Sequence, residues 1–193
     1  MPEVLTAEQR LGTLKTTAVR SAGTPLIGAS RVARRVHQLG RQISTVYTDI
    51  DSPLVLVVIL KGATVFAADL LRSLTIPAEL EFVRAASYGS GTSSEGRPLR
   101  LARMVEGNLR DRHVLLVEDI VDSGRTAHAV IRSVKRMQPA SLRLAALLDR
   151  PARRTIEVPI DFQGFTIPDR FVIGYGLDYA GLYRELPAIY SLS

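Results

Sequence analysis

Val114-Leu-Leu-Val-Glu-Asp-Ile-Val-Asp-Ser-Gly-Arg-Thr126 is the stretch that decides the fold. Its apolar start predicts a strand over 113–117 that is buried on both faces, as in a parallel sheet. A turn follows, and apolar residues at helical spacing then predict a helix from Gly124 to Met137. Open α/β sheets bind ligands at the carboxyl ends of their strands, so we expect the chemistry in the polar residues between this strand and this helix.

The same alternation of strand and helix extends over most of the chain. Further strands are predicted at 54–60, 79–86, 141–148 and 171–174, and further helices at 30–47 and 64–74. Alternating strands and helices imply right-handed parallel crossovers, and therefore an α/β fold with an open sheet flanked by helices. The sequence has no internal repeat and no linker, so we expect a single domain over 1–193.

The turn Asp122-Ser-Gly-Arg-Thr126 has the features of a site for a terminal phosphate. The first N–H groups of a helix have no partner within the helix, and the helix dipole adds positive potential there. Ser123 and Thr126 supply hydroxyls, and Gly124 lets the backbone approach a ligand closely. The spacing of a P-loop is absent.

Glu118 and Asp119 are adjacent carboxylates directly before this turn. Carboxylates accept hydrogen bonds from the hydroxyls of a ribose, and they help to hold hydrated Mg²⁺. A phosphate at the helix start and a diol at the strand end together describe ribose 5-phosphate. The alternative is that Asp122 or Ser123 only caps the helix and that the two acids are solvated, but burying unpaired charges without a ligand is costly.

Composition excludes several kinds of chemistry. The 193 residues include no cysteine, which rules out disulfides, thiolate nucleophiles and cysteine metal sites. The longest apolar run, Leu54 to Leu60, is far shorter than the about 20 residues needed to cross a bilayer. The first eight residues lack the pattern of a secretory signal, so we expect a cytoplasmic protein without a membrane partner.

The net charge of +6 is concentrated near the start of the chain, where only Glu3 and Glu8 oppose it before residue 48. The basic residues there are Arg10, Lys15, Arg20, Arg31, Arg34, Arg35 and Arg41. Such a surface attracts phosphates, including those of nucleic acids. A solvated helix face is the simpler interpretation, and we do not expect nucleic acid as a partner.

Residues 114–126 resemble the phosphoribosyl-diphosphate signature of the type I phosphoribosyltransferases. Leu60-Lys61-Gly62 is similar to the pyrophosphate loop of that family, and Ser87-Tyr88-Gly89 to the start of its catalytic lid. The segment from Asp169 to Arg184 is similar to the purine site of the hypoxanthine-guanine enzymes. The resemblance covers roughly residues 50–193. It implies the type I fold, with a mobile lid near 87–100 and a small hood that is built from the terminal segments and binds the purine near 150–193.

The resemblance also implies roles for the residues of the signature. Glu118 and Asp119 would bind the ribose hydroxyls, with Mg²⁺ nearby, and Asp122 would be the general base that takes the N7 proton of the purine. The 5′-phosphate would be held by Ser123, Gly124, Arg125 and Thr126. Lys61, Gly62 and Arg184 would bind the pyrophosphate, and the Leu60–Lys61 peptide is expected to be cis, as it often is in the family.

Four further residues are assigned to the purine by the same resemblance. Phe171 would stack on the base, Val172 would present its backbone to the edge of the 6-substituent, and Asp178 would lie near the metal and the pyrophosphate. Arg150 stands where the family has a lysine that donates to O6; its planar fork is not a point charge, so the ranking of hypoxanthine, guanine and xanthine is left open. The substrates would be phosphoribosyl diphosphate and a 6-oxopurine, in a homodimer or homotetramer.

Three alternatives remain at this point. The first is a sister enzyme that prefers xanthine or another base. The second is a regulator that keeps the fold and binds RNA, although intact Asp122, Lys61 and lid residues favour catalysis. The third is a phosphosugar-binding module without transfer.

Overall fold

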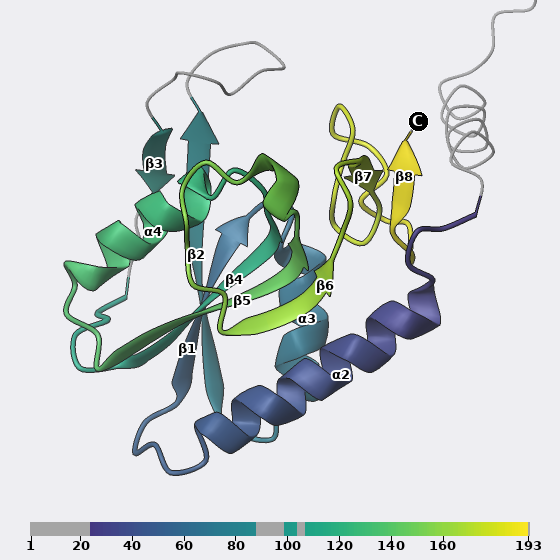
Figure 1. The fold of residues 1–193 in the computed structure, drawn as a ribbon. Helices are drawn as coiled ribbons and strands as arrows, with labels where there is room; N and C mark the ends of the chain where they lie inside the picture. Colours follow the sequence, from purple (N-terminus) through teal and green to yellow (C-terminus); the bar gives the residue numbers. More distant parts are fainter. Residues whose placement is uncertain (1–23, 88–98, 104–106, 193) are drawn as a thin grey trace, which may run out of the picture.

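The computed structural model describes residues 24–87, 99–103 and 107–192. Its largest feature is a six-stranded sheet of order β3-β2-β1-β4-β5-β6 (Figure 1). The strands are β1 Leu54–Leu60, β2 Ala78–Ser87, β3 Leu99–Arg103, β4 His113–Val121, β5 Ser141–Asp149 and β6 Phe162–Thr166. Five of them are parallel, and β3 is antiparallel to β2 at the edge. The expected open, mostly parallel sheet is confirmed.

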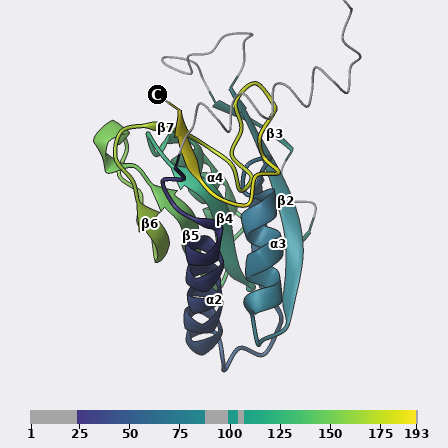
Figure 2. The same ribbon diagram turned by 90° about the vertical axis from the view of Figure 1, so that its right-hand side faces the viewer.

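Helices cover both faces of this sheet. α2 Ala29–Val46 and α3 Thr64–Ser73 lie side by side on one face, and α4 Arg125–Lys135 covers the other (Figures 1 and 2). A short 3-10 helix, Pro151–Arg153, follows β5. Within the described residues, no helix combines the length and the apolar content that crossing a membrane requires.

β1 shows why an unbroken apolar run forms the centre of the sheet. Leu56 and Val58 pack in the core beneath α2 and α3, whereas Val55 and Val57 pack in the core beneath α4. Alternate side chains of a strand point to opposite faces, so a strand covered on both sides must be apolar at every position. The prediction of two-sided burial is confirmed for β1 and for Val114 to Val117 of β4. His113, at the start of β4, is only partly buried.

The largest difference from the sequence prediction is the length of β4. The strand was expected to end at Val117, but it continues through Glu118 and Asp119 to Val121. Its pairing with β5 also continues, from Glu118 opposite Ala146 to Val121 opposite Asp149. Backbone hydrogen bonds hold the strand together past the point where the apolar pattern stops, so the two acids belong to the strand rather than to the loop after it.

Four further strands differ from the prediction. No strand was expected at β3 or at residues 190–192. β6 was not expected, because its sequence is short, has a central glycine and includes polar residues. β7 Phe171–Ile173 was expected, but it pairs antiparallel with β8 Tyr190–Leu192 in a separate two-stranded sheet instead of extending the main one. Ile27 also exchanges two backbone hydrogen bonds with Ile189. Chain from both sides of the main fold therefore meets beside β7 and β8, as expected for the hood.

The predicted lid falls mostly outside the described residues. Ser87 is the last residue of β2, and Tyr88 lies in the stretch 88–98 that the structure does not describe. Leu99 and Arg100, at the expected end of the lid, pair with β2 as part of β3, and the lid itself stays a prediction.

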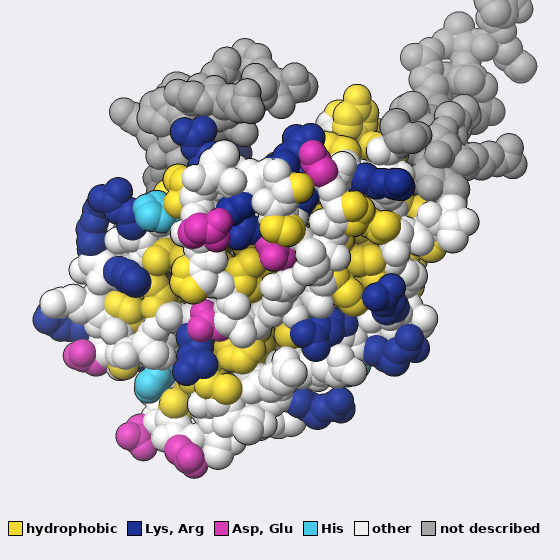
Figure 3. All heavy atoms as spheres, in the orientation of Figure 1, with side chains coloured by type: hydrophobic (Ala, Val, Ile, Leu, Met, Phe, Trp, Pro, Cys, Tyr) yellow, Lys and Arg dark blue, Asp and Glu magenta, His cyan; other side chains and the backbone are white. Residues whose placement is uncertain are grey.

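The basic surface of α2 has a structural function in part. Basic side chains, all of them arginines in α2, gather along this helix in the space-filling view (Figure 3). Arg35 donates from Nε to the carbonyl of Gly164 at 3.1 Å and from Nη2 to that of Gln163 at 2.5 Å. The guanidinium of Arg31 lies 5.4 Å from the ring centre of Phe165. Two of the basic residues therefore attach α2 to the edge strand β6, whereas Arg34 is exposed.

We predict that Arg35→Met lowers the free energy of unfolding by about 1–3 kcal/mol, because it removes charge-assisted hydrogen bonds to two carbonyls of β6. Arg34→Met is the matched control. It removes the same charge from the same helix and should change stability by no more than about 0.5 kcal/mol. Urea denaturation of both variants measures the difference, and equal losses would show that the contact of Arg35 with β6 contributes nothing specific.

Candidate active site

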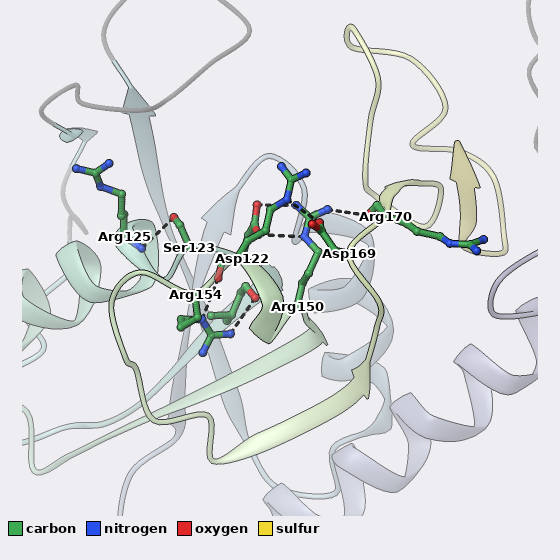
Figure 4. A network of polar contacts seen from close by, with 9 residues as sticks. Asp122, Ser123, Arg125, Arg150, Arg154, Asp169 and Arg170 are labelled. Atoms are coloured by element: carbon green, nitrogen blue, oxygen red, sulfur yellow. Dashed lines mark hydrogen bonds and ion pairs between the residues drawn. The ribbon is translucent and has the colours of Figure 1, made fainter. Parts of the chain in front are cut away.

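The turn between β4 and α4 forms a cradle of backbone N–H groups. α4 begins at Arg125, and its N-cap residue Gly124 has φ +83°, a left-handed conformation that favours glycine. A Cβ at Gly124 would also lie 2.0 Å from the carbonyl oxygen of Ile156. Oγ of Ser123 accepts a long hydrogen bond, 3.4 Å, from the N–H of Arg125 (Figure 4). The first turn of α4 therefore offers N–H donors and positive potential to an anion.

Asp122 is held by Arg150 rather than by the helix that follows it. Arg150 donates from Nε to Oδ1 at 3.0 Å and from Nη2 to Oδ2 at 2.6 Å, and from Nη1 to the carbonyl of Arg170 at 2.6 Å (Figure 4). The Arg150 side chain is only 8% exposed, whereas that of Asp122 is 36% exposed. Asp122 is thus not the helix cap. Its carboxylate is fixed in orientation and remains open to a ligand.

Glu118 is a buried acid with an unsatisfied oxygen. Its Oε2 has no hydrogen-bond partner in the described part of the chain. Burial raises the pKa of Glu118 well above its ordinary value, and the neighbouring charge of Asp119 raises it further. A buried oxygen without a partner is costly, so this position is suited to accept a hydrogen bond from a ligand hydroxyl or to face a cation.

Asp119 lies against the loop that follows β1. A Cβ at Gly62 would be 1.7 Å from Oδ2 of Asp119, so only glycine allows this approach. Burial raises the pKa of Asp119 to about 6, although the backbone N–H groups of Ile120 and Asp119 and the charge of Arg184 act in the opposite direction. The charge of Asp178 adds a smaller increase. The ends of β1 and β4 are therefore in contact.

The loop after β1 carries the expected pyrophosphate residues. The peptide between Leu60 and Lys61 is cis, which confirms that prediction. The Lys61 side chain is exposed. The backbone carbonyl of Lys61 accepts a hydrogen bond from Oγ1 of Thr64 at 2.8 Å. A Cβ at Gly176 would lie 2.2 Å from the carbonyl oxygen of Gly62. The chain after β7 therefore packs directly on this loop.

Asp178 and Arg184 form an ion pair that faces Asp119. Nη2 of Arg184 lies 2.6 Å from Oδ1 of Asp178, and Nη1 donates to the carbonyl of Gly176 at 2.6 Å. Oδ2 of Asp178 accepts from the N–H of Gly181 at 2.7 Å. Both charges are near enough to act on the Asp119 carboxyl. Residues from three distant parts of the sequence thus meet at one edge of the sheet.

Phe171 presents an aromatic face on the same segment. It is 48% exposed and packs edge-to-face with Tyr179, with ring centres 5.8 Å apart, while Val172 is buried. Tyr179 is 57% exposed and was not expected to take part. Exposed aromatic rings are suited to stack on a flat base. Tyr179 could not be found from the sequence, because it lies in a turn of the hood that has no periodic pattern.

The acids do not form a metal site by themselves. No group of three or more His, Cys, Asp or Glu residues in the described ranges has the arrangement of a metal site. Mg²⁺ usually keeps several waters and binds through one or two carboxylates plus the phosphates of its substrate. The orphaned Oε2 of Glu118 and the nearby Asp119 fit that mode.

Comparison with known proteins places the chain among relatives of known activity. Residues 30–180 match the model of the phosphoribosyl transferase domain family. The hypoxanthine phosphoribosyltransferase of Salmonella typhimurium is 44% identical over 164 residues, which is 85% of this chain and 92% of that protein.

Solved structures agree with these relatives. A hypoxanthine phosphoribosyltransferase from Staphylococcus aureus has a TM-score of 0.84 at 32% identity, covering 92% of this chain and 95% of that chain. A hypoxanthine-guanine phosphoribosyltransferase from Bacillus anthracis has a TM-score of 0.80 at 36% identity, covering 89% and 99% respectively.

We predict that Asp119→Asn makes the ligand-free protein more stable at pH 7.5, with a melting temperature higher by roughly 2–5 °C. An acid whose pKa is raised by folding favours the folded state when it is protonated, so its contribution is lost as the pH rises through about 6. The gain should therefore shrink between pH 7.5 and pH 5, as measured by scanning calorimetry. Asp51→Asn, at an exposed position, is the control. A destabilised D119N protein at pH 7.5 would show that attraction to Arg184 outweighs burial.

Proposed function

The chain belongs to the phosphoribosyl transferase family, and we propose that it is a hypoxanthine phosphoribosyltransferase of purine salvage. It transfers the 5-phosphoribosyl group from phosphoribosyl diphosphate to hypoxanthine or guanine, forming IMP or GMP and pyrophosphate. The observation that supports this most strongly is the position of the phosphate cradle of α4 directly after Glu118 and Asp119 on β4. A phosphate at the helix start and hydroxyls at the strand end are the two parts of a ribose 5-phosphate.

The phosphoribosyl group is held at two places along this edge. The N–H groups and hydroxyls of Ser123, Gly124, Arg125 and Thr126 bind the 5′-phosphate, in the manner of anions at helix N-termini. Glu118 and Asp119 accept hydrogen bonds from the ribose hydroxyls. These hydrogen bonds satisfy the buried oxygen of Glu118 that lacks a partner among the described residues.

The reaction forms a bond between N9 of the purine and C1′ of the ribose while the bond from C1′ to the pyrophosphate breaks. The electron pair of the breaking bond leaves with the pyrophosphate, and Lys61 and Arg184 stabilise the negative charge that it gains. Asp122 takes the N7 proton as N9 becomes nucleophilic. Each carboxylate oxygen has two lone pairs, so Asp122 can accept this proton while its carboxylate stays hydrogen-bonded to Arg150.

Mg²⁺ is the cofactor that these residues fit. Glu118, Asp119 and Asp178 would hold it through water and substrate oxygens, and when bound it neutralises the charge of the diphosphate. Asp178 also keeps Arg184 in place through their ion pair.

The purine binds between the hood and the end of β5. Phe171 stacks on its face, and the backbone of Val172 contacts the edge that carries the 6-substituent. Arg150 uses three of its five N–H groups on Asp122 and Arg170, so two remain to donate to a 6-oxo oxygen. An amino group at that position could not accept them, which disfavours adenine.

Three further proposals carry over expectations from the sequence. Ser87, Tyr88 and the residues after them form a lid that closes over the reacting centre to exclude water. The protein acts in the cytoplasm on small molecules, without nucleic acid. It assembles as a homodimer or homotetramer.

A spectrophotometric assay with phosphoribosyl diphosphate, Mg²⁺ and one purine base at a time tests the proposed function. We expect the highest kcat/KM with hypoxanthine or guanine and little turnover of adenine or orotate. A preference for xanthine would change the proposed substrate but not the proposed reaction. Turnover of adenine or orotate above all others would contradict the assignments of Phe171 and Arg150.

Asp122→Asn is the informative variant in the same assay. Loss of a general base lowers kcat by about 10²- to 10⁴-fold. The dissociation constant of phosphoribosyl diphosphate should change by less than roughly threefold, because the base acts in the transition state. Equal losses in turnover and in affinity would favour a phosphosugar-binding role for this residue.

A further inference from the structure

A second arginine with a largely buried side chain, Arg154, lies beneath the phosphate cradle. Its side chain is 8% exposed, and the three groups that it contacts are all acceptors. It donates from Nε to the carbonyl of Asp122 at 2.9 Å and from Nη2 to the carbonyl of Val121 at 3.1 Å, and it pairs with the carboxylate of Asp149 (Figure 4). The proposed reaction uses neither Arg154 nor Asp149.

The residues directly after Arg154 hold the next carbonyl of the loop. The carbonyl of Ser123 accepts hydrogen bonds from the N–H groups of Thr155 and Ile156, both at 3.0 Å, and from Oγ1 of Thr155 at 3.1 Å. Three successive carbonyls, those of Val121, Asp122 and Ser123, are therefore turned toward one segment, 154–156. A loop that binds an anion needs this arrangement, because a carbonyl oxygen on the ligand side would repel a phosphate.

The orientation of these carbonyls fixes the orientation of the N–H groups. In a planar trans peptide the carbonyl of one residue and the N–H of the next point in opposite directions. Held carbonyls at Asp122 and Ser123 therefore direct the N–H groups of Ser123 and Gly124 away from segment 154–156. The carbonyl of Val121 also accepts from the N–H of Arg150 at 3.0 Å, so the peptide that depends most on Arg154 is the one between Asp122 and Ser123.

We propose that Arg154, paired with Asp149, is a positioning residue that turns the peptide between Asp122 and Ser123 so that its N–H faces the 5′-phosphate. This inference rests on the proposed function, because it assumes that a phosphate binds at the start of α4. Arginine suits the task because one planar guanidinium can donate to two carbonyls and a carboxylate together, which a lysine ammonium on a flexible stem does poorly. Asp149 neutralises the buried charge and fixes the plane of the guanidinium.

The contact between the loop and this segment is tight. A Cβ at Gly124 would be 2.0 Å from the carbonyl oxygen of Ile156 and 3.1 Å from Cδ of Arg154. The loop therefore rests directly on Arg154 and Ile156, with no room for a side chain between them. A change at Arg154 should be felt at the phosphate site more than at the purine site, because Arg150 holds the Asp122 carboxylate independently of Arg154.

Calorimetric titration of IMP and of inosine into Arg154→Lys and Arg154→Met tests the proposal, since the two ligands differ only in the 5′-phosphate. We expect the dissociation constant of IMP to rise by about tenfold or more in both variants, a loss of about 1.4 kcal/mol. That of inosine should change by less than about twofold. Asp149→Asn should also raise the dissociation constant of IMP, by a smaller factor.

Arg153→Met is the matched control. Arg153 is the neighbouring arginine, has an exposed side chain and pairs with Asp169 at 2.6 Å. Its replacement removes the same charge from the same segment and should leave both dissociation constants unchanged.

Three outcomes would overturn the proposal. An equal loss of affinity for IMP and inosine, or an Arg154→Lys protein that no longer folds, would give Arg154 a general structural role. No change of either affinity in a folded variant would show that Arg154 does not position the peptide. A wild-type protein that does not bind IMP at all would instead refute the proposed function.

Discussion

Glu118 and Asp119 lie where β4 reaches the edge of the sheet, and burial raises the pKa of both carboxyls. Two adjacent acids with little access to water are unfavourable in the free protein, and one oxygen of Glu118 has no partner in the described structure. Ribose hydroxyls and a cation would satisfy both groups. The rest of the site is arranged around this requirement, because each neighbouring element supplies positive charge, N–H donors or space to the end of β4.

Three segments converge on that point for different physical reasons. The loop after β1 approaches Asp119 because Gly62 has no side chain. The chain after β7 packs on Gly62 and brings the ion pair of Asp178 and Arg184 toward Asp119. Beyond β4, Arg150 fixes the carboxylate of Asp122 and Arg154 holds its carbonyl. The two arginines thus constrain the same residue through its side chain and its backbone.

The parts of this arrangement that follow a local pattern could be predicted from the sequence. Unbroken apolar runs identified β1 and most of β4, and adjacent acids before a Ser-Gly turn led to the proposed phosphoribosyl site. The extension of β4 to Val121 could not be predicted, because backbone pairing with β5 maintains it where the side chains are polar. The same holds for Arg154 and Tyr179, whose roles depend on contacts between segments rather than on spacing. The pair of Arg150 and Asp122 was partly predictable. Each residue directly follows one of two neighbouring parallel strands, and these strands end at the same edge of the sheet.

A crystal structure of the complex with IMP is the most direct test of a ribose 5-phosphate site at the end of β4. The phosphate should lie on the N–H groups of residues 123–126, the ribose hydroxyls within hydrogen-bond distance of Glu118 or Asp119, and the purine against Phe171. An IMP molecule whose phosphate lies away from the start of α4, or whose ribose does not contact either acid, would contradict it.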